Sequence, residues 1–302
     1  MAKETVLVTG GCGFIGTHTV KLLIQKGYNV IIIDRKPKIA HLENIVYYQF
    51  DLADSNIEKV FQRHNIDYII HLAAQPSVAL SFSNPQQDCM DNYFTTVNIC
   101  FFAKKYGIKK IIFSSTAAEY AYPKYLPVDE IHPTEFLSPY AISKNACENF
   151  IKISGVDYII FRYSNVFGPG QDSKGEAGVV AIFYDSMINN LPINIYGDGE
   201  QYRDFIFVKD IAKANVAAIE TPVKNEIINV STNTKTSINE LFNKMKNLLG
   251  YNLKPNYLPQ REGDIKKSVL SNNKLKKLLK IEPKISVEKG LNEMKGIKPS
   301  QV

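Results

Sequence analysis

The feature that most constrains this chain is a glycine-rich turn between a short apolar strand and a helix. The strand is expected at Thr5–Thr9, and Gly10-Gly11-Cys12-Gly13-Phe14-Ile15-Gly16 follows it and opens the helix. Gly10 permits a tight turn, Gly13 lets the backbone approach a phosphate, and Gly16 permits close helix–strand packing. Free N–H groups and the positive end of the helix dipole can then hold phosphates. The sequence therefore predicts a dinucleotide site that includes Gly10, Gly13, Phe14, Ile15 and Gly16.

An acidic residue at the end of the second apolar strand supports this prediction and favours NAD as the cofactor. The Asp34 carboxylate can accept hydrogen bonds from the adenosine ribose hydroxyls and would repel a 2′-phosphate. Arg35 beside it is the one residue that argues against a preference for NAD over NADP. A purely structural turn with a solvated Asp is the alternative, and the strand and helix on either side disfavour it. Further cofactor contacts are expected where the third and fourth strands end, at Asp51, Leu52, Leu72, Ala73 and Ala74.

The first half of the chain alternates short apolar runs with helical stretches. Such runs suit parallel strands that are buried on both faces, and repeated strand–helix units predict a doubly wound α/β fold of the Rossmann type. The helices are expected at about 13–26, 55–64, 84–106 and 138–154. The strands are expected at Val6–Val8, Val30–Ile33, Val46–Phe50, Tyr68–His71, Ile111–Phe113 and Tyr158–Phe161.

The alternation weakens after Arg162, where Gly and Pro residues mark a loop-rich region. We therefore expect an NAD-binding domain over residues 1–165 and a smaller α/β substrate domain over 166–302. The apolar runs Phe205–Ile219 and Ile227–Val230 predict that segments at about 205–230 return to the first domain.

Charge and cysteine content limit the class of protein. The net charge is +6, but the lysines gather towards the end, at Lys274, Lys276, Lys277 and Lys280, which predicts the solvated face of a terminal helix. An anionic substrate such as a nucleotide diphosphate explains the balance equally well, so nucleic-acid binding is not expected. Cys12, Cys89, Cys100 and Cys147 form no C-x-x-C pair, so we expect reduced, buried thiols of a cytosolic protein and no metal site. Because the first strand is expected so early, we expect no signal peptide, and no apolar run approaches the ~20 residues that span a bilayer.

Three polar residues are candidates for acid–base chemistry. Tyr140 and Lys144 lie at i and i+4 on a predicted helix that Ser138-Pro139 begins, so both face the same side. A nearby ammonium group and an oxidised nicotinamide ring are expected to lower the phenol pKa from its usual value near 10. Thr116 ends the fifth strand, at the carboxyl edge where such sheets bind ligands. An amphipathic helix with a surface Lys and a strand-end hydroxyl is the structural alternative.

With these residues the chain resembles the extended short-chain dehydrogenase/reductase family, specifically the nucleotide-sugar epimerases typified by UDP-glucose 4-epimerase. The resemblance covers nearly the whole chain and rests on several motifs in order, which are the glycine turn, His71–Ala74, Ser114–Thr116, Tyr140–Lys144, Phe161–Asn165, Tyr196–Phe205 and Arg261–Asp264. It implies that bound NAD takes a hydride from C4 of a UDP-hexose and returns it to the other face of a 4-keto sugar. Tyr140 is then the base, Thr116 bridges to the sugar, and Lys144 binds the nicotinamide ribose.

The same resemblance implies how the substrate is held. Arg203 and Arg261 match positions that clamp the diphosphate, and Asp264 matches a ribose-binding position. Asn165 matches an amide that contacts the diphosphate or sugar, and Tyr196 a ring that packs on uracil. Without the family pattern, an ordinary surface Arg, loop Asp or core Tyr is the simpler interpretation of each.

Two departures from the family pattern bear on the substrate. Related 4,6-dehydratases and decarboxylases carry an acidic residue shortly after the catalytic Thr, whereas Ala117 and Ala118 stand here. Glu119 follows on what is expected to be the other side of an extended segment, so it is not expected to replace that acid. Ala121 replaces the usual Gly after Tyr120 and is expected to alter a turn.

Ser268 stands where epimerases restricted to unsubstituted hexoses tend to have Tyr, so a small side chain is expected to leave room for an N-acetyl group and for UDP-GlcNAc or UDP-GalNAc.

The rival interpretations are a UDP-glucuronate 4-epimerase, a nucleotide-sugar reductase that consumes NADPH, and a non-catalytic redox-sensing or RNA-binding module. The last class generally lacks the Tyr or the Lys, and this chain has both. By analogy the protein is expected to form a homodimer through the helices around 84–106 and 138–154.

Overall fold

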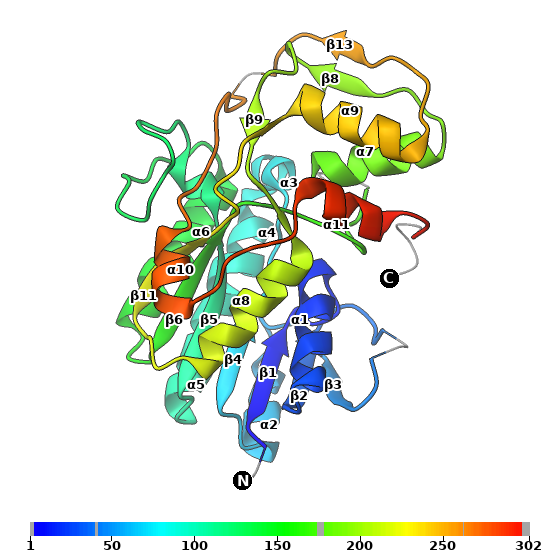
Figure 1. The fold of residues 1–302 in the computed structure, drawn as a ribbon. Helices are drawn as coiled ribbons and strands as arrows, with labels where there is room; N and C mark the ends of the chain where they lie inside the picture. The colour runs from blue at the N-terminus through cyan, green and yellow to red at the C-terminus, as the bar shows by residue number, and fades with distance from the viewer. Residues whose placement is uncertain (1–2, 40–41, 174–177, 262, 298–302) are drawn as a thin grey trace.

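A seven-stranded parallel sheet organises the protein, with the strand order β11-β6-β5-β4-β1-β2-β3 (Figure 1). It is seen in a computed structural model that describes residues 3–39, 42–173, 178–261 and 263–297. Each strand pairs in parallel with its neighbours, which confirms the predicted doubly wound α/β fold. The strands are β1 (Thr5–Thr9), β2 (Asn29–Asp34), β3 (Ile45–Gln49), β4 (Tyr68–His71), β5 (Lys110–Thr116), β6 (Tyr158–Tyr163) and β11 (Glu226–Val230).

Helices cover both faces of this sheet because its strands are apolar on both faces. In β1, Val6 and Val8 point into one core while Leu7 points into the other, as the two-residue period of a strand requires. One face is covered by α1 (Phe14–Gln25), α8 (Val208–Glu220) and α10 (Asn273–Leu279). The opposite face is covered by α2 (Glu58–Arg63), α5 (Thr95–Lys105) and α6 (Pro139–Ile153), with the short helix η1 (Ser55–Ile57) before α2.

The helical stretch expected at 84–106 is continuous but changes its winding in the middle. It follows α3 (Val78–Ser83) and runs from α4 (Pro85–Cys89) through a π-helical turn, η2 (Met90–Phe94), into α5. Such π-turns are rare and occur most often near functional sites.

The second region carries its own apolar core above the carboxyl edge of the sheet (Figure 1). Three helices form it, α7 (Val179–Ile188), α9 (Ile238–Leu249) and α11 (Val287–Met294). Three pairs of short strands complete it, β7 (Asn165–Phe167) with β10 (Phe205–Phe207), β8 (Asn194–Tyr196) with β13 (Asn256–Leu258), and β9 (Tyr202–Arg203) with β12 (Thr236–Ser237).

The chain crosses back to the first core more than once. Helix α8 packs against α1, and β11 pairs with β6 at the edge of the main sheet. Leu275 and Leu279 of α10 also enter the first core, although the sequence pattern predicts that segment for the second region. The division into two domains remains a proposal, with α10 as a further segment that returns.

Two local expectations were wrong. Cys89 is exposed, whereas the other three cysteines are buried, because it ends α4 on the outer side. Residues Ala117–Tyr120 form a 3₁₀ turn, η3, and are not extended. After this turn Ala121 adopts φ +45° and ψ −116°, a conformation that glycine accommodates best, so the chain makes this backbone turn in spite of the alanine side chain. Within the described residues, no helix is long and apolar enough to cross a membrane, and no cluster of three or more His, Cys, Asp or Glu could hold a metal ion.

Candidate active site

The glycine turn is packed so closely that side chains are excluded at two positions. Gly10 has φ +69°, and a Cβ there would lie 2.7 Å from the backbone nitrogen of Ala73. A Cβ on Gly16 would lie 2.1 Å from the carbonyl oxygen of Gly10. The carboxyl ends of β1 and β4 therefore meet at the turn. This is the point where strand order reverses, and it is the place where ligands bind in open α/β sheets.

The N-terminus of α1 suits an anion. Gly13 is its N-cap and supplies no side-chain cap, and no acidic residue stands in the first turn. The backbone N–H groups are thus available to a pyrophosphate, and the dipole favours negative charge there. Phe14 and Ile15 begin the helix and are half-buried. The chain's own residues fit a dinucleotide at this turn.

Asp34 is buried at the end of β2 and holds the turn in place. One carboxylate oxygen accepts from the Cys12 backbone N–H at 2.9 Å, and the other from the Lys36 N–H at 2.9 Å. Each oxygen keeps a lone pair that could accept a further hydrogen bond.

The ends of β3 and β4 line the same edge. Leu52 is buried, whereas Asp51 is exposed and accepts from the Ala53 N–H at 2.8 Å. Leu72, Ala73 and Ala74 are half-buried after β4. Beneath them the buried His71 ring hydrogen-bonds to the hydroxyls of Thr9 (2.7 Å) and Thr96 (3.0 Å), and burial lowers its pKa to about 3. A neutral His71 thus ties β1 and β4 to the helix behind them.

Tyr140, Thr116 and Lys144 come together at the carboxyl end of β5. Ser138 caps α6 by accepting from the Ala141 N–H at 3.2 Å, and Pro139 takes the first helical position, so Tyr140 begins the helix facing β5. Its phenol is close enough to the hydroxyl of Thr116 for that hydroxyl to lower the phenol pKa. The Lys144 ammonium, one turn further on, lies 4.2 Å from the centre of the Phe113 ring.

The electrostatics of these groups differ from the expectation for Tyr140. Burial raises the pKa of its phenol to about 12, and the hydrogen bond from Thr116 lowers it only in part. The expected lowering relied on two cations, Lys144 and the oxidised nicotinamide ring, and it is not a property of the protein's side chains alone. Burial also lowers the pKa of the Lys144 ammonium. Four nearby side chains oppose this shift and raise the pKa in part, namely Cys147, Glu119, Glu148 and Asp88.

The predicted substrate residues of the second region pair with one another. Arg203 donates to Asp264 at 2.8 Å, and the Arg261 guanidinium lies 3.8 Å above the ring centre of Tyr196. Asp264 and Arg261 line a cavity of about 580 Å³ together with Tyr122, Gln260, Gly263 and Lys266.

Two further residues frame this region. Asn165 is exposed at the start of β7. The Ser268 N–H donates to the Tyr202 carbonyl at 3.2 Å, which places Ser268 next to Arg203. The segment after Ser268 pairs with the loop that follows η3, because the Val128 N–H donates to the Val269 carbonyl at 2.9 Å. That pairing connects the substrate region with the strand end that carries Thr116.

Comparison with known proteins identifies the family. The profile of the NAD dependent epimerase/dehydratase family matches residues 6–231. The chain belongs to this family. It is 42% identical to the provisionally named UDP-glucose 4-epimerase of Methanocaldococcus jannaschii, over 96% of each chain. The enzyme is thus an NAD-dependent epimerase of the short-chain dehydrogenase/reductase type.

Two solved structures match the epimerase over almost its full length. The UDP-glucose 4-epimerase of Thermotoga maritima, solved with UDP-glucose, superposes with a TM-score of 0.92 at 41% identity and covers 96% of this chain and 97% of its own. The UDP-N-acetylglucosamine 4-epimerase of Methanobrevibacter ruminantium M1, in complex with UDP-N-acetylmuramic acid, superposes with a TM-score of 0.90 at 35% identity and covers 97% and 99%.

Sequence reasoning missed a buried charge cluster behind α6, the helix that carries Tyr140 and Lys144. Arg162 on β6 donates two hydrogen bonds to Glu148 of α6, at 2.9 and 2.7 Å, and lies 3.1 Å from the Glu119 carboxylate. Glu119 also accepts from Ser115 at 2.7 Å and from Asn145 at 2.8 Å. These contacts turn Glu119 into the interior, between β5, β6 and α6. Charged residues are rarely buried, so composition gave no signal for this cluster.

The cluster predicts a pH-dependent stability. Burial and the neighbouring Glu148 carboxylate raise the pKa of Glu119 to about 8, against the opposing effect of Arg162. An acid whose pKa is raised on folding stabilises the protein fully below its unfolded value, and this contribution disappears as the pH rises through the folded value. Between pH 5.5 and 8.5 we expect wild type to lose roughly 2–4 kcal/mol of unfolding free energy relative to Glu119→Gln. Urea unfolding of both proteins at the two pH values measures this, and parallel pH profiles would contradict it.

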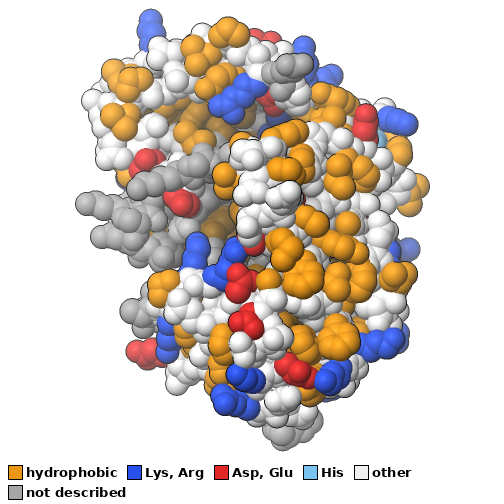
Figure 2. All heavy atoms as spheres, turned by 180° about the vertical axis from the view of Figure 1, so that it is seen from behind, with side chains coloured by type: hydrophobic (Ala, Val, Ile, Leu, Met, Phe, Trp, Pro, Cys, Tyr) orange, Lys and Arg blue, Asp and Glu red, His pale blue; other side chains and the backbone are white. Residues whose placement is uncertain are grey.

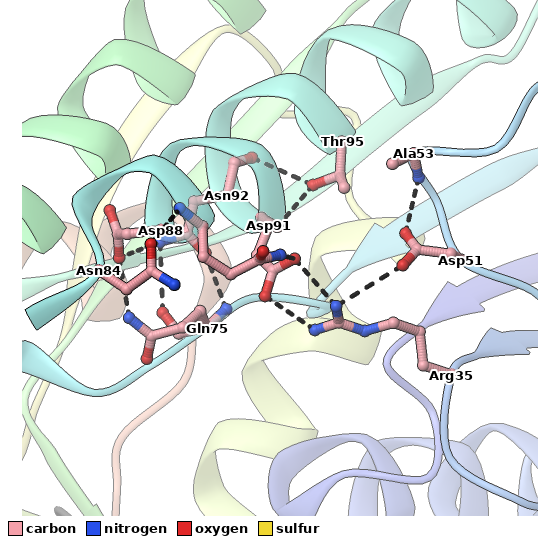
Figure 3. A network of polar contacts seen from close by, with 10 residues as sticks. Arg35, Asp51, Ala53, Gln75, Asn84, Asp88, Asp91, Asn92 and Thr95 are labelled. Atoms are coloured by element: carbon pink, nitrogen blue, oxygen red, sulfur yellow. Dashed lines mark hydrogen bonds and ion pairs between the residues drawn. The ribbon is translucent and has the colours of Figure 1, made fainter. Parts of the chain in front are cut away.

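A second buried network holds the π-turn against α6. The Asn92 side chain, which is 1% exposed, donates to Asp88 at 3.0 Å and to Ser143 at 3.1 Å, and accepts from the Gln75 N–H at 2.8 Å. The Gln75 side chain donates to the same Asp88 oxygen at 2.9 Å (Figure 3). This network fixes the loop after β4 relative to the helix that carries Tyr140.

Proposed function

We propose that the protein catalyses NAD-dependent 4-epimerisation of a UDP-hexose through a transient 4-keto sugar. The observation that carries this proposal is that the Thr116 hydroxyl acts on the Tyr140 phenol at the end of β5, with Lys144 one turn along the same helix. This group stands at the carboxyl edge of a sheet whose adjacent glycine turn fits a dinucleotide. The family and the two solved epimerases support the reaction class.

The protein's own residues would divide the work as follows. When bound, NAD supplies a hydride acceptor that returns the hydride after the sugar has turned. Tyr140 removes the proton of the 4-hydroxyl and gives it back, and Thr116 shares that proton. Lys144 binds the nicotinamide ribose and favours the phenolate form of Tyr140. Glycines Gly10, Gly13 and Gly16, with Phe14 and Ile15, hold the pyrophosphate. Asp34 takes the ribose, and Asp51, Leu52, Leu72, Ala73 and Ala74 border the rest of the cofactor.

Substrate binding is assigned to the second region. Arg203 and Arg261 clamp the diphosphate, since guanidinium groups form forked hydrogen bonds with phosphate oxygens. The ion pair with Asp264 holds Arg203 in one orientation, and Asp264 itself binds the uridine ribose. Tyr196 packs on uracil with the ring face that Arg261 leaves open, and Asn165 contacts the diphosphate or sugar. A firmly held nucleotide keeps the reactive ketone from escaping while it turns.

The test uses purified protein and UDP-glucose without added cofactor, followed through the anomeric NMR signals. Formation of UDP-galactose supports both the reaction and tightly held NAD. UDP-glucuronate and NADPH oxidation are assayed in parallel. Turnover of the uronate alone would favour a UDP-glucuronate 4-epimerase, and net NADPH consumption a reductase.

The sugar range is proposed to include UDP-GlcNAc and UDP-GalNAc because Ser268 is small. Ser268→Tyr is expected to lower the kcat/KM for UDP-GlcNAc by about 10–200-fold, since the ring would fill the space for the N-acetyl group. UDP-glucose activity should fall much less. Ser268→Ala is the matched control and should keep both activities. Full UDP-GlcNAc activity in Ser268→Tyr would show that the N-acetyl group lies elsewhere.

A homodimer is also proposed. Figure 2 shows hydrophobic side chains gathered on the face of the molecule opposite to that of Figure 1. Helices α3 to α6 expose large apolar side chains on their outer surfaces, and contiguous apolar patches mark interaction sites. These side chains are Leu80, Phe82, Phe94, Phe101, Ile142 and Ile153. A cytoplasmic location and a role in galactose metabolism remain predictions from the sequence.

A further inference from the structure

Arg35 follows β2 at the edge of the sheet where the cofactor is proposed to bind. An arginine at this place favours NADP, but the guanidinium of Arg35 is already bound to other side chains. Its guanidinium donates to both oxygens of the Asp91 carboxylate, at 2.9 and 3.0 Å. The same nitrogen that makes the shorter contact lies 3.6 Å from the Asp51 carboxylate. Figure 3 shows the Arg35 side chain leaving the end of β2 and reaching towards η2, with Asp91 and Asp51 on either side of its guanidinium. Two carboxylates therefore neutralise this cation.

The Asp91 carboxylate is the better anchored side of this pair. Its side chain is 11% exposed, against 50% for Arg35. It also accepts from the Gln87 side chain at 2.8 Å, so a second residue of the same helical stretch fixes its position. Asp91 thus determines where the Arg35 guanidinium lies, and not the reverse.

The orientation of the Arg35 guanidinium matters for the choice between NAD and NADP. It follows Asp34 directly, at the place where the adenosine ribose is proposed to lie. A free guanidinium beside the ribose matches the geometry of a 2′-phosphate and favours NADP. An arginine whose fork is already filled by a carboxylate cannot offer those bonds without breaking the pair, and the Asp91 charge repels the phosphate as well.

We propose that Asp91 is a cofactor-specificity residue, which keeps Arg35 from recognising a 2′-phosphate and so maintains the preference for NAD. This inference rests on the proposed placement of the ribose at Asp34. It goes beyond the reaction itself, because Asp91 belongs to the helical stretch behind β4 and to no motif of the cofactor turn.

Competition binding tests the inference directly. Labelled NAD⁺ bound to the purified enzyme is displaced with NADP⁺ or with unlabelled NAD⁺. In Asp91→Ala we expect the NADP⁺ concentration for half displacement to fall about 10-fold relative to that of NAD⁺. The gain should shrink at high salt because it comes from charge. Asp91→Asn, which keeps the shape and can still accept from Gln87, should show a smaller gain in the same direction. It also serves if the alanine variant fails to fold.

Two matched variants make the outcome decisive. Arg35→Ala/Asp91→Ala should lose the gain, since no guanidinium is left to bind the phosphate. Asp157 forms an exposed ion pair with Lys224 (2.9 Å), which joins the start of β6 to the loop before β11. Asp157→Asn disrupts this pair and should not change the ratio of the NADP⁺ and NAD⁺ concentrations for half displacement. An unchanged ratio in both Asp91 variants overturns the inference, and so does a gain that survives without Arg35.

The placement of the ribose is checked separately. Asp34→Asn should weaken binding of NAD⁺ more than that of NADP⁺. If it weakens neither, the ribose lies elsewhere and the inference falls with that assignment, whereas the proposed epimerase reaction would still stand. If Asp34→Asn behaves as expected and the Asp91 variants do not, the inference on Asp91 alone is wrong.

Discussion

Tyr140→Phe is expected to lower kcat for UDP-glucose epimerisation by at least about 1,000-fold, because the phenol is proposed to carry the proton in both halves of the reaction. KM should change little, since the residues proposed to clamp the diphosphate lie in the second region. The stability of the fold should also be kept, because the ring remains. Initial rates measured by NMR of the anomeric signals, with bound cofactor quantified by absorbance and unfolding followed in urea, give all three quantities.

A second phenol provides the control. The Tyr251 hydroxyl donates to the Leu191 carbonyl at 2.7 Å in the second region, so Tyr251→Phe also removes one hydrogen-bonded hydroxyl. It should leave kcat within a factor of a few. An active Tyr140→Phe enzyme would mean that another group removes the 4-hydroxyl proton.

Arg162→Met is expected to lower the free energy of unfolding by about 3–5 kcal/mol, because it leaves two carboxyl groups buried without their cation. Glu119 and Glu148 are both fully buried, and Arg162 is 3% exposed. Urea unfolding at pH 7 measures the loss.

The loss should be partly reversed when the acids are neutralised. Arg162→Met/Glu119→Gln/Glu148→Gln is expected to recover part of the lost stability, since Glu148→Gln leaves no unpaired buried carboxylate and the amide that Glu119→Gln introduces cannot ionise. Arg63→Met changes the same residue type at the exposed end of α2 and should cost within about 0.5 kcal/mol. Equal losses in Arg63→Met and Arg162→Met would show that the buried cluster contributes nothing special.

The central sheet could be predicted because each of its strands is a short apolar run that can be recognised in the sequence by itself. Runs such as Val30–Ile33 are apolar throughout, and only a strand covered on both faces buries every side chain of such a run. Helix starts were also predictable, as at Ser138-Pro139, where cap and first turn agree. The return of α10 to the first core was not predictable, because its two buried leucines, Leu275 and Leu279, would fit any nearby core.

In the candidate site, too, some residues could be predicted from the sequence and others could not. Gly10, Gly16, Thr116, Tyr140 and Lys144 follow strand ends or helix starts, so sequence order already places them at one edge. The buried partners of this site come from distant segments. The sequence around Glu119 gives no sign of Arg162, 43 residues later, and that around Arg35 gives no sign of Asp91, 56 residues later. Such pairs depend on how the strands are ordered in the sheet, which only the folded structure shows.

The most direct test of the proposed reaction follows the hydrogen at C4. UDP-glucose carrying deuterium at C4 is incubated with the enzyme in ordinary water, without added cofactor, and the product is analysed by NMR and mass spectrometry. Hydride removal and return within one closed site predict UDP-galactose that keeps its deuterium at C4. A product that carries solvent hydrogen at C4, or the absence of any 4-epimer, would contradict the proposed reaction.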